Sequence, residues 1–371
     1  MNLIGVMGCT PRLPENFPVE FPENSGNMIH ANAPFEMFGN CVFIRDDLRR
    51  YGETNFVSLV NNHCSHLIVT LANTLRIGAE DGSKFTRQLQ FMQQIKRPIV
   101  IFGLGVQSKS YDLESATLPP EAIEWLRFLG ERCVTVGVRG EYTKAVIEKL
   151  SGIRNVTVVG CPSFFSRPAA LAALRKHERR GRPSYAGTHF DEAAELSMLG
   201  EAIRSDTFLV EPVNRFSHTY YTHVSRGGSP EEQLPYFVKK LMKADSQLSS
   251  TDIARYFRAN YRLFRSTEAW YEFNSELVSF TYGTRFHVNM ASILSGRPAL
   301  WVTHDSRTQE LVKQLHLPSL PLHEAAALSV ADIESKLEHQ LAEFFDHLGG
   351  HFKQFNDYLV ANGLPAIKYN F

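Results

Sequence analysis

The stretch from Ser279 to Leu317 constrains the fold more than any other part of the chain. An apolar run at Leu277–Phe280 ends in a Tyr-Gly-Thr turn, and a segment of small residues follows at Val288–Leu294. Pro298 then opens a second apolar run, which ends in His-Asp-Ser-Arg. This order predicts a strand, a turn, a helix and a second strand, with polar side chains where each strand ends. Because ligands of open α/β sheets bind at that edge, the stretch also predicts where the chemistry lies.

Arg285 and His287 are the candidate functional residues of the turn. An Arg side chain can bind two oxygens of a phosphate or carboxylate, and a His can give or take a proton near neutral pH. At a helix start the two residues fit an anionic substrate that needs a proton. If the strand continues through them instead, both side chains share one face. An Arg–carboxylate surface pair and a core His explain the same residues about equally well.

The rest of the chain alternates strands and helices, which predicts an α/β fold with doubly wound, Rossmann-like sheets. Its 371 residues are about twice a typical single domain, so two domains are expected. In the first half we predict strands at Leu3–Met7, His66–Leu71, Ile99–Phe102, Cys133–Val138 and Val156–Val159, and helices at Lys84–Gln94, Pro120–Leu129 and Glu141–Leu150. In the second half we predict strands at Thr207–Val210, Tyr261–Phe264, Leu277–Phe280 and Ala299–Val302, and helices at Asp191–Ile203, Glu231–Lys243, Asp252–Ala259, Thr267–Asn274, Val288–Leu294 and Arg307–Leu315.

The predicted domain boundary lies between Ala169 and Pro183, where the sequence changes character. An Ala-rich helix there leads into a basic run and then into a Ser-Tyr-Ala-Gly-Thr loop. We therefore predict a first Rossmann-like domain over residues 1–170 and a second over residues 185–345, which face each other across a cleft. The tail from Val330 to Ala361 is predicted as one or two amphipathic helices. Residues 346–371 are assigned to a C-terminal helix that packs on the first domain.

Charge and cysteine content narrow the class of protein. Lys and Arg number 39 and Asp and Glu number 39, so the formal net charge is zero, which argues against bulk binding of nucleic acid. The five cysteines are odd in number and form no Cys-x-x-Cys pair, which fits a reduced, cytoplasmic protein. No apolar run is long enough for a membrane helix, and the first ten residues resemble a strand more than a signal peptide. Residues 175–182 are expected to form a solvated linker, with contact to the inner face of a membrane as the alternative.

Three further segments carry candidate binding residues. Gly103, Gly105 and Gln107 follow a predicted strand and either let the backbone approach an anion or form a tight turn. Arg139 ends another strand and either binds an anion or pairs with a nearby glutamate. The segment Asn24-Ser25-Gly26-Asn27 precedes a predicted helix and either offers amide donors to a ligand or caps that helix.

Neither a metal nor a cofactor is expected. The sequence contains no GxSxG, HExxH or GxxxxGK[ST] motif. Cys161 ends a strand in Gly-Cys-Pro-Ser, but no second metal ligand lies at a useful spacing from it.

The ordered set of these motifs resembles the polysaccharide pyruvyltransferase family, over about residues 24 to 318. The strongest match is to the family's Arg-Leu-His-Gly segment, followed by Gly-x-Pro, an apolar strand and an Asp-x-Lys-like turn. The matching residues here are Arg285-Phe286-His287-Val288, Gly296-Arg297-Pro298, Ala299–Val302 and Asp305-Ser306-Arg307, together with residues 98–107, Val138-Arg139, residues 156–163 and Asn24-Ser25-Gly26-Asn27. The departures are Phe286 and Val288 for Leu and Gly, Asn27 for Asp, Arg307 for Lys, and Ala72-Asn73-Thr74 where the family often has a Gly-Gly turn.

The resemblance implies two domains arranged as in GT-B glycosyltransferases, with the active site in the cleft and the acceptor on the first domain. It also implies phosphoenolpyruvate as donor and a hydroxyl pair of a free, nucleotide-linked or lipid-linked sugar as acceptor. On this basis the expected catalytic residues are His287 as general acid and Arg285 and Arg139 as donor clamp. The expected substrate-binding residues are Asn24, Gly26, Asn27, Gly103, Gly105, Gln107, Tyr282, Thr284, Asp305 and Arg307.

Two other functions are compatible with the sequence. In a GT-B glycosyltransferase, Gly103 and Gly105 would hold a nucleotide-sugar pyrophosphate and Arg285 would clamp it. In a catalytically silent member of the family, the same surface would bind a glycan without turnover, although the retained Arg285 and His287 argue against that.

Overall fold

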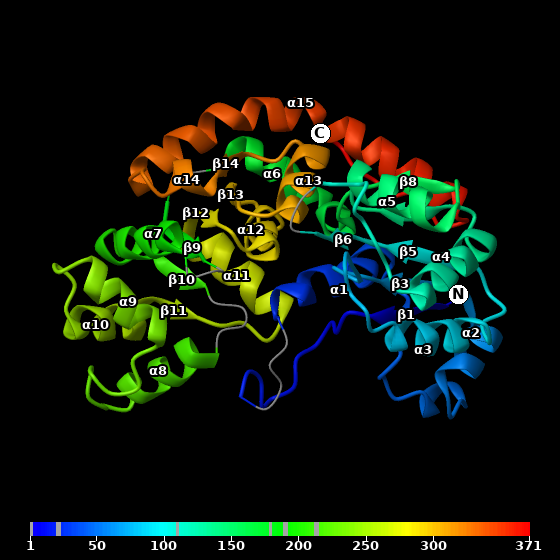
Figure 1. Cartoon of the computed structure of the whole chain (residues 1–371), viewed down its shortest axis with the longest axis horizontal. Helices are drawn as coiled ribbons and strands as arrows, with labels where there is room; N and C mark the ends of the chain where they lie inside the picture. Colours follow the sequence, from blue (N-terminus) through cyan, green and yellow to red (C-terminus); the bar gives the residue numbers. More distant parts are fainter. Residues whose placement is uncertain (1–2, 20–23, 109–110, 178–179, 188–191, 211–214) are drawn as a thin grey trace.

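The first half of the chain forms a parallel sheet covered by helices on both faces (Figure 1). The computed structural model describes residues 3–19, 24–108, 111–177, 180–187, 192–210 and 215–371. The strand order is β2-β1-β3-β5, and a second parallel pair, β7-β8, packs beside β5. The bounds are β1 Leu3–Gly8, β2 Cys41–Phe43, β3 Cys64–Thr70, β5 Ile99–Phe102, β7 Val136–Val138 and β8 Val156–Val158, with a short pair of β4 Leu75–Arg76 and β6 Val106–Gln107. The helices are α1 Gly26–Phe38, η1 Arg49–Tyr51, α2 Phe56–His63, α3 Ser83–Met92, α4 Pro120–Arg132, α5 Glu141–Ser151, η2 Pro162–Phe165, α6 Pro168–Ala173 and η3 Leu174–Lys176.

The second half builds a six-stranded parallel sheet in the order β11-β10-β9-β12-β13-β14. Its strands are β9 Arg182–Ala186, β10 Phe208–Val210, β11 Tyr261–Arg262, β12 Val278–Gly283, β13 Ala299–Thr303 and β14 Ser319–Pro321. Its helices are α7 Ala193–Arg204, α8 Arg215–Ser225, α9 Tyr236–Ala244, α10 Ser250–Asn260, α11 Thr267–Leu277, α12 Phe286–Ile293, α13 Ser306–Leu315 and α14 Leu322–Ala325. The two sheets confirm the predicted α/β class with two parallel-sheet domains.

Strand β9 corrects one prediction. Its last three residues, Ser184 to Ala186, were expected to begin a Ser-Tyr-Ala-Gly-Thr loop, and Ser and Gly are common in turns. The strand instead lies inside the second sheet, paired with β10 on one side and β12 on the other. Ser184 and Tyr185 are fully buried there, so burial in the sheet outweighs the local preference for a turn.

Helix α15 joins the two domains. It runs over 32 residues from Val330 to Ala361, begins with a capping box at Ser329 and Asp332, and passes over both sheets (Figure 1). Near its end, Tyr358 Oη donates a hydrogen bond to the Ile101 carbonyl over 2.7 Å, and Gln354 donates to Val158. The C-terminal end of the helix therefore packs on the first sheet, while the domain limits themselves stay predictions.

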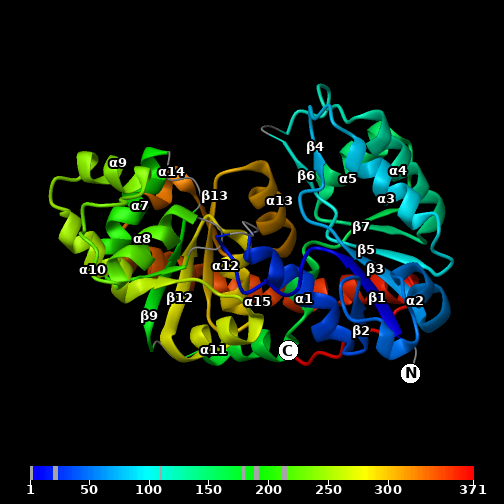
Figure 2. The same ribbon diagram turned by 90° about the horizontal axis from the view of Figure 1, so that it is seen from below.

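Helix α1 lies where the two domains meet (Figure 2). It belongs to the first domain by sequence, yet it packs against α12 and α11 of the second as well as against η2. Residues at its N-terminus are thereby held close to the residues at the start of α12. Within the described residues, no helix combines the length and hydropathy that crossing a membrane requires.

Candidate functional site

The turn between β12 and α12 fixes Arg285 at the edge of the second sheet. Gly283 has φ of +139°, and a Cβ on it would lie 2.3 Å from the Ala186 carbonyl oxygen, so the close approach requires glycine. The Arg285 backbone N–H donates to Ala186, and its Nε donates to the Gly187 carbonyl over 3.1 Å. Helix α12 begins at Phe286, with Arg285 as its N-cap. The two candidate residues therefore lie at a helix start and not on one face of a strand.

A small pocket, with a cavity volume of about 60 Å³, opens between the two domains at this turn. Its lining brings together seven of the residues predicted from sequence, from both domains and from the start of α1. They are Asn24, Gly26, Asn27, Arg139, Arg285, His287 and Arg307; Ala72, Asn73, Phe286, Val288 and Leu311 complete the lining.

Arg139 is the most unusual of these residues. Its side chain is buried, with 2% of its surface exposed, and Nη1 donates to Asn73 Oδ1 over 2.8 Å. Its Nε and Nη2 atoms have no hydrogen-bond partner among the described residues. A buried charge without partners costs several kcal/mol, roughly, unless a counter-charge satisfies it. The guanidinium is therefore placed for an anion that enters the pocket.

Arg307 adds a second positive charge on the α13 side. Its Nη2 lies 3.4 Å from Asp305 Oδ2, while its buried Nε has no partner among the described residues. Asp305 caps α13 by accepting a hydrogen bond from the Thr308 N–H. Burial alone would raise the pKa of Asp305, but Arg307, His304 and the hydrogen bonds from Thr308 together lower it, so the carboxylate stays charged. Asp305 thus orients Arg307 and does not line the pocket.

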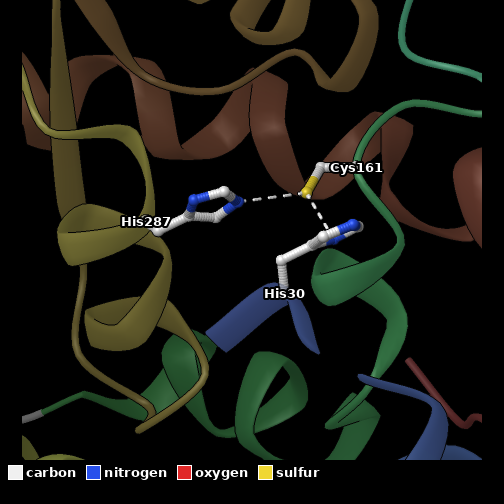
Figure 3. Close-up of side chains that lie close together, drawn as sticks. All are labelled: His30, Cys161 and His287. Carbon is white, nitrogen blue, oxygen red and sulfur yellow. Dashed lines mark hydrogen bonds between the residues drawn. The ribbon is translucent and has the colours of Figure 1, made fainter. Parts of the chain in front are cut away.

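His287 lines the pocket and makes contacts behind it with two residues that the sequence analysis did not connect to it (Figure 3). Its Nε2 lies 3.5 Å from Cys161 Sγ, and His30 Nδ1 lies 3.8 Å from the same sulfur. Burial, and then the charges of His30, Arg139 and Arg307, lower the pKa of His287 well below its usual value. Burial and Arg139 lower the pKa of His30 to about 3. Both rings are therefore neutral when the pocket holds no anion.

The remaining predicted residues lie outside the pocket. Tyr282 is buried in the core of the second domain, and Thr284 donates to Glu195 beneath the turn. Gly103 and Gly105 lie behind the lining: a Cβ on Gly103 would come within 2.6 Å of His30 Cε1, and one on Gly105 within 2.7 Å of Arg139 Cδ. Both glycines shape the pocket by leaving room for its side chains. Gln107 lies on β6 and does not line it.

Sequence reasoning missed His30 and the contacts of Cys161. No potential metal ligand lies close to Cys161 in the sequence, so nothing linked it to a histidine. In the structure two histidines lie beside it, His30 on α1 and His287 on α12. The only signal for His30 was a histidine in a helix whose other residues are mostly small or apolar. Asn73 was noted as a departure from a Gly-Gly turn, and the structure shows it holding Arg139.

A family model for polysaccharide pyruvyl transferase matches residues 36–306. The chain belongs to this family. The match covers most of both domains and includes Arg139, Cys161, Arg285 and His287. A comparison with curated protein sequences finds no match.

Among solved structures, members of the sugar-nucleotide epimerase and glycosyltransferase groups are similar in fold. UDP-GlcNAc 2-epimerase from Methanocaldococcus jannaschii is 9% identical, with a TM-score of 0.43 over 89% of this chain and 93% of that one. S. aureus MnaA, in a co-structure with UDP, is 12% identical, with a TM-score of 0.46 over 100% of each chain. The α,α-trehalose-phosphate synthase (UDP-forming) from Burkholderia vietnamiensis is 10% identical, with a TM-score of 0.44 over 98% of this chain and 99% of that one.

Proposed function

We propose that this pyruvyl transferase family member moves pyruvate from phosphoenolpyruvate onto two hydroxyls of a sugar as a ketal, in polysaccharide or glycan biosynthesis. The observation that carries the proposal is the buried Arg139, which lines the same pocket as His287 and two further arginines and has two nitrogens without a hydrogen-bond partner among the described residues. Phosphoenolpyruvate has a carboxylate and a phosphate, and guanidinium groups bind both well. A neutral substrate would leave this buried charge unpaired.

The proposed reaction begins with a proton. His287 delivers it to C3 of the enol, which becomes a methyl group and leaves C2 with cationic character. One sugar hydroxyl adds at C2, inorganic phosphate leaves, and the neighbouring hydroxyl closes the ketal with loss of the hydroxyl protons. Burial, and then His30, Arg139 and Arg307, lower the pKa of His287 in the free pocket. In this proposal the bound anion offsets the charges of the two arginines, and His287 takes up the proton that it delivers. The scheme uses no metal and no cofactor.

The acceptor is proposed to be a free, nucleotide-linked or lipid-linked saccharide that reaches the pocket from the first-domain side. Asn24 and Asn27 line that side, and amides suit sugar hydroxyls. Phosphoenolpyruvate is a metabolite of the cytoplasm, so we place the reaction there. A lipid-linked acceptor would bring the enzyme to the inner face of a membrane. The basic run at residues 175–182 is a candidate for that contact, although residues 178–179 lie outside the described part of the chain.

Release of inorganic phosphate from phosphoenolpyruvate, with a panel of sugar acceptors, tests the proposal. We expect acceptor-dependent release by the wild type and a kcat lower by about 10²–10⁴-fold in His287→Ala, the usual worth of general-acid catalysis. His339→Ala, on the exposed face of α15, is the control and should behave as the wild type. Wild-type turnover in His287→Ala would exclude His287 as the general acid.

A nucleotide-sugar glycosyltransferase is the second candidate, because the pocket also suits a pyrophosphate. Thermal-shift titration separates the two. Stabilisation by phosphoenolpyruvate and not by nucleoside diphosphates supports pyruvyl transfer, and the reverse result supports glycosyl transfer. Binding of a glycan without turnover of either donor would indicate a silent member of the family.

A further inference from the structure

His30, Cys161 and His287 form a group of three potential metal ligands directly behind the pocket (Figure 3). They come from α1, from the turn between β8 and η2, and from α12, so both domains contribute. Each offers one ligand atom, namely His30 Nδ1, Cys161 Sγ and His287 Nε2, and these atoms all lie within 4.8 Å of one another. Two imidazoles and a thiolate are donors that Zn²⁺ and similar borderline-soft cations prefer.

The distances suit a shared ion. With Zn–S near 2.3 Å and Zn–N near 2.0–2.1 Å, a nitrogen and a sulfur on one tetrahedral zinc lie about 3.5 Å apart. The observed separations from Cys161 Sγ are 3.5 Å to His287 Nε2 and 3.8 Å to His30 Nδ1. Small side-chain movements would therefore complete the coordination. Of the three residues, His287 also lines the pocket, which is the side from which a fourth ligand would come.

The residues around the three ligands support the same assignment. Ser163 Oγ lies 3.1 Å from Cys161 Sγ, and so it can donate a hydrogen bond to a thiolate. Metal-bound histidines usually donate their second N–H to an oxygen, which orients the ring. The backbone carbonyls of Leu71 and Phe102 lie near the His30 ring, although its buried Nε2 has no hydrogen-bond partner within the described residues.

The local charge sets a condition on metal binding. Arg139 and Arg307 repel a divalent cation, whereas a thiolate at Cys161 attracts Arg139 and offsets part of that repulsion. An anion at the fourth position would offset the remainder, and the arginines already attract one.

We infer that His30, Cys161 and His287 bind one borderline-soft divalent cation such as Zn²⁺, with a fourth position open to the pocket. The ion occupies Nε2 of His287 and holds the ring in place, so it competes with protonation of that residue. Zn²⁺ is thus an inhibitor of the enzyme, and this consequence rests on the proposed function. The binding of the metal ion does not depend on the proposed function.

Titration of the full-length, reduced protein with Co²⁺ tests the binding. We expect one equivalent to give the thiolate-to-cobalt absorption and the visible bands of a tetrahedral site, and Zn²⁺ to displace it. Cys161→Ser should lose the thiolate absorption, and Cys133→Ser, which removes another buried thiol, should keep it. His30→Gln retains the thiol and should bind at least about tenfold more weakly. Absence of the thiolate absorption in the wild type, or its persistence in Cys161→Ser, overturns the inference. Tetrahedral bands without it would place cobalt on other histidines, such as those of α15, and overturn it equally.

Phosphate release then tests the inhibition. Zn²⁺ should reduce wild-type turnover in proportion to the occupancy found by Co²⁺ competition, and a chelator should restore it. Full activity at full occupancy overturns the inhibitory role. If no acceptor supports turnover at all, the proposed function fails, while the Co²⁺ titration still decides the metal site.

Discussion

At the scale of single residues, the site depends on positive charge that the described residues pair only in part. Among them, two buried nitrogens of Arg139 and one of Arg307 have no hydrogen-bond partner. Such groups reduce the stability of the free protein, and a bound anion stabilises it by pairing with them. The residues of the pocket therefore favour ligand binding at the cost of folding stability, as is common at functional sites.

Replacing Arg139 by Lys tests this arrangement. Lysine keeps the charge but cannot make the paired contacts of a guanidinium, so we expect the KM for phosphoenolpyruvate to rise by about tenfold or more with a smaller change in kcat. Steady-state kinetics at saturating acceptor measure it. Arg127→Lys, on α4, provides the control. An unchanged donor KM would refute the clamp role of Arg139.

Gly103 supports the site from behind. Its φ is +78°, and a Cβ there would lie 2.6 Å from His30 Cε1 and 2.9 Å from the Leu71 carbonyl oxygen. We expect Gly103→Ala to lower the free energy of unfolding by more than about 1 kcal/mol and to displace His30. Gly39→Ala is a matched control, because its φ is +72° but nothing lies near its Cβ position. Equal losses in the two variants, measured by urea unfolding, would show that contact with His30 is unimportant.

At the scale of secondary-structure elements, helix α15 contains a buried histidine. Burial, and then His316 and His347, lower the pKa of His351 from 6.5 to about 4. Its Nε2 lies 3.0 Å from His316 Nδ1, at the C-terminal end of α13. In the unfolded chain this histidine takes up a proton below about pH 6.5. In the native protein His351 stays neutral until the pH falls to about 4. Stability from this residue is therefore present above pH 6.5 and is lost as the pH falls from 6.5 towards 4.

We accordingly expect the urea midpoint of the wild type to fall more steeply between pH 7 and pH 4.5 than that of His351→Gln. His339→Gln, an exposed position on the same helix, should follow the wild type. Parallel pH curves for the wild type and His351→Gln would exclude the effect.

The elements also show what the sequence can and cannot predict. Runs such as Ile99–Phe102 and Ala299–Thr303 are apolar on both faces, and that pattern alone identifies buried parallel strands. Strand β9 has no such pattern, and its place in the sheet comes from burial against β10 and β12. His30 and Cys161 are separated by 131 residues, so only the packing of α1 against η2 and α12 brings them near His287.

At the scale of the whole molecule, α13 and α5 connect the domains at the rim of the pocket. Glu310 on α13 accepts hydrogen bonds from the Thr143 N–H over 2.8 Å and from its hydroxyl over 2.9 Å, at the N-terminus of α5. A carboxylate is favourable at that end of a helix. The contact ties α13 of the second domain to α5 of the first, close in sequence to the pocket residues Leu311 and Arg139.

Loss of this contact should loosen the domains. We expect Glu310→Ala to lower the free energy of unfolding by about 1–3 kcal/mol, because it leaves buried donors on Thr143 unpaired. Gln309→Ala, exposed on the same helix, should change it little. Chemical unfolding followed by tryptophan fluorescence measures both. An unaffected Glu310→Ala would mean that the α13–α5 contact adds nothing to stability.

The course of α15 has a consequence for how the protein is made. Phe352, Phe355, Tyr358 and Leu364 fill the core beneath the first sheet together with Ile4 and Val100. During synthesis the first sheet leaves the ribosome long before those residues do, so it emerges without the side chains that cover one of its faces. Until those residues have been synthesised, the sheet exposes apolar surface. Such surface promotes aggregation and is bound by chaperones. A stop codon that removes Phe352–Leu364 would therefore damage the first domain, although that domain precedes it in the chain.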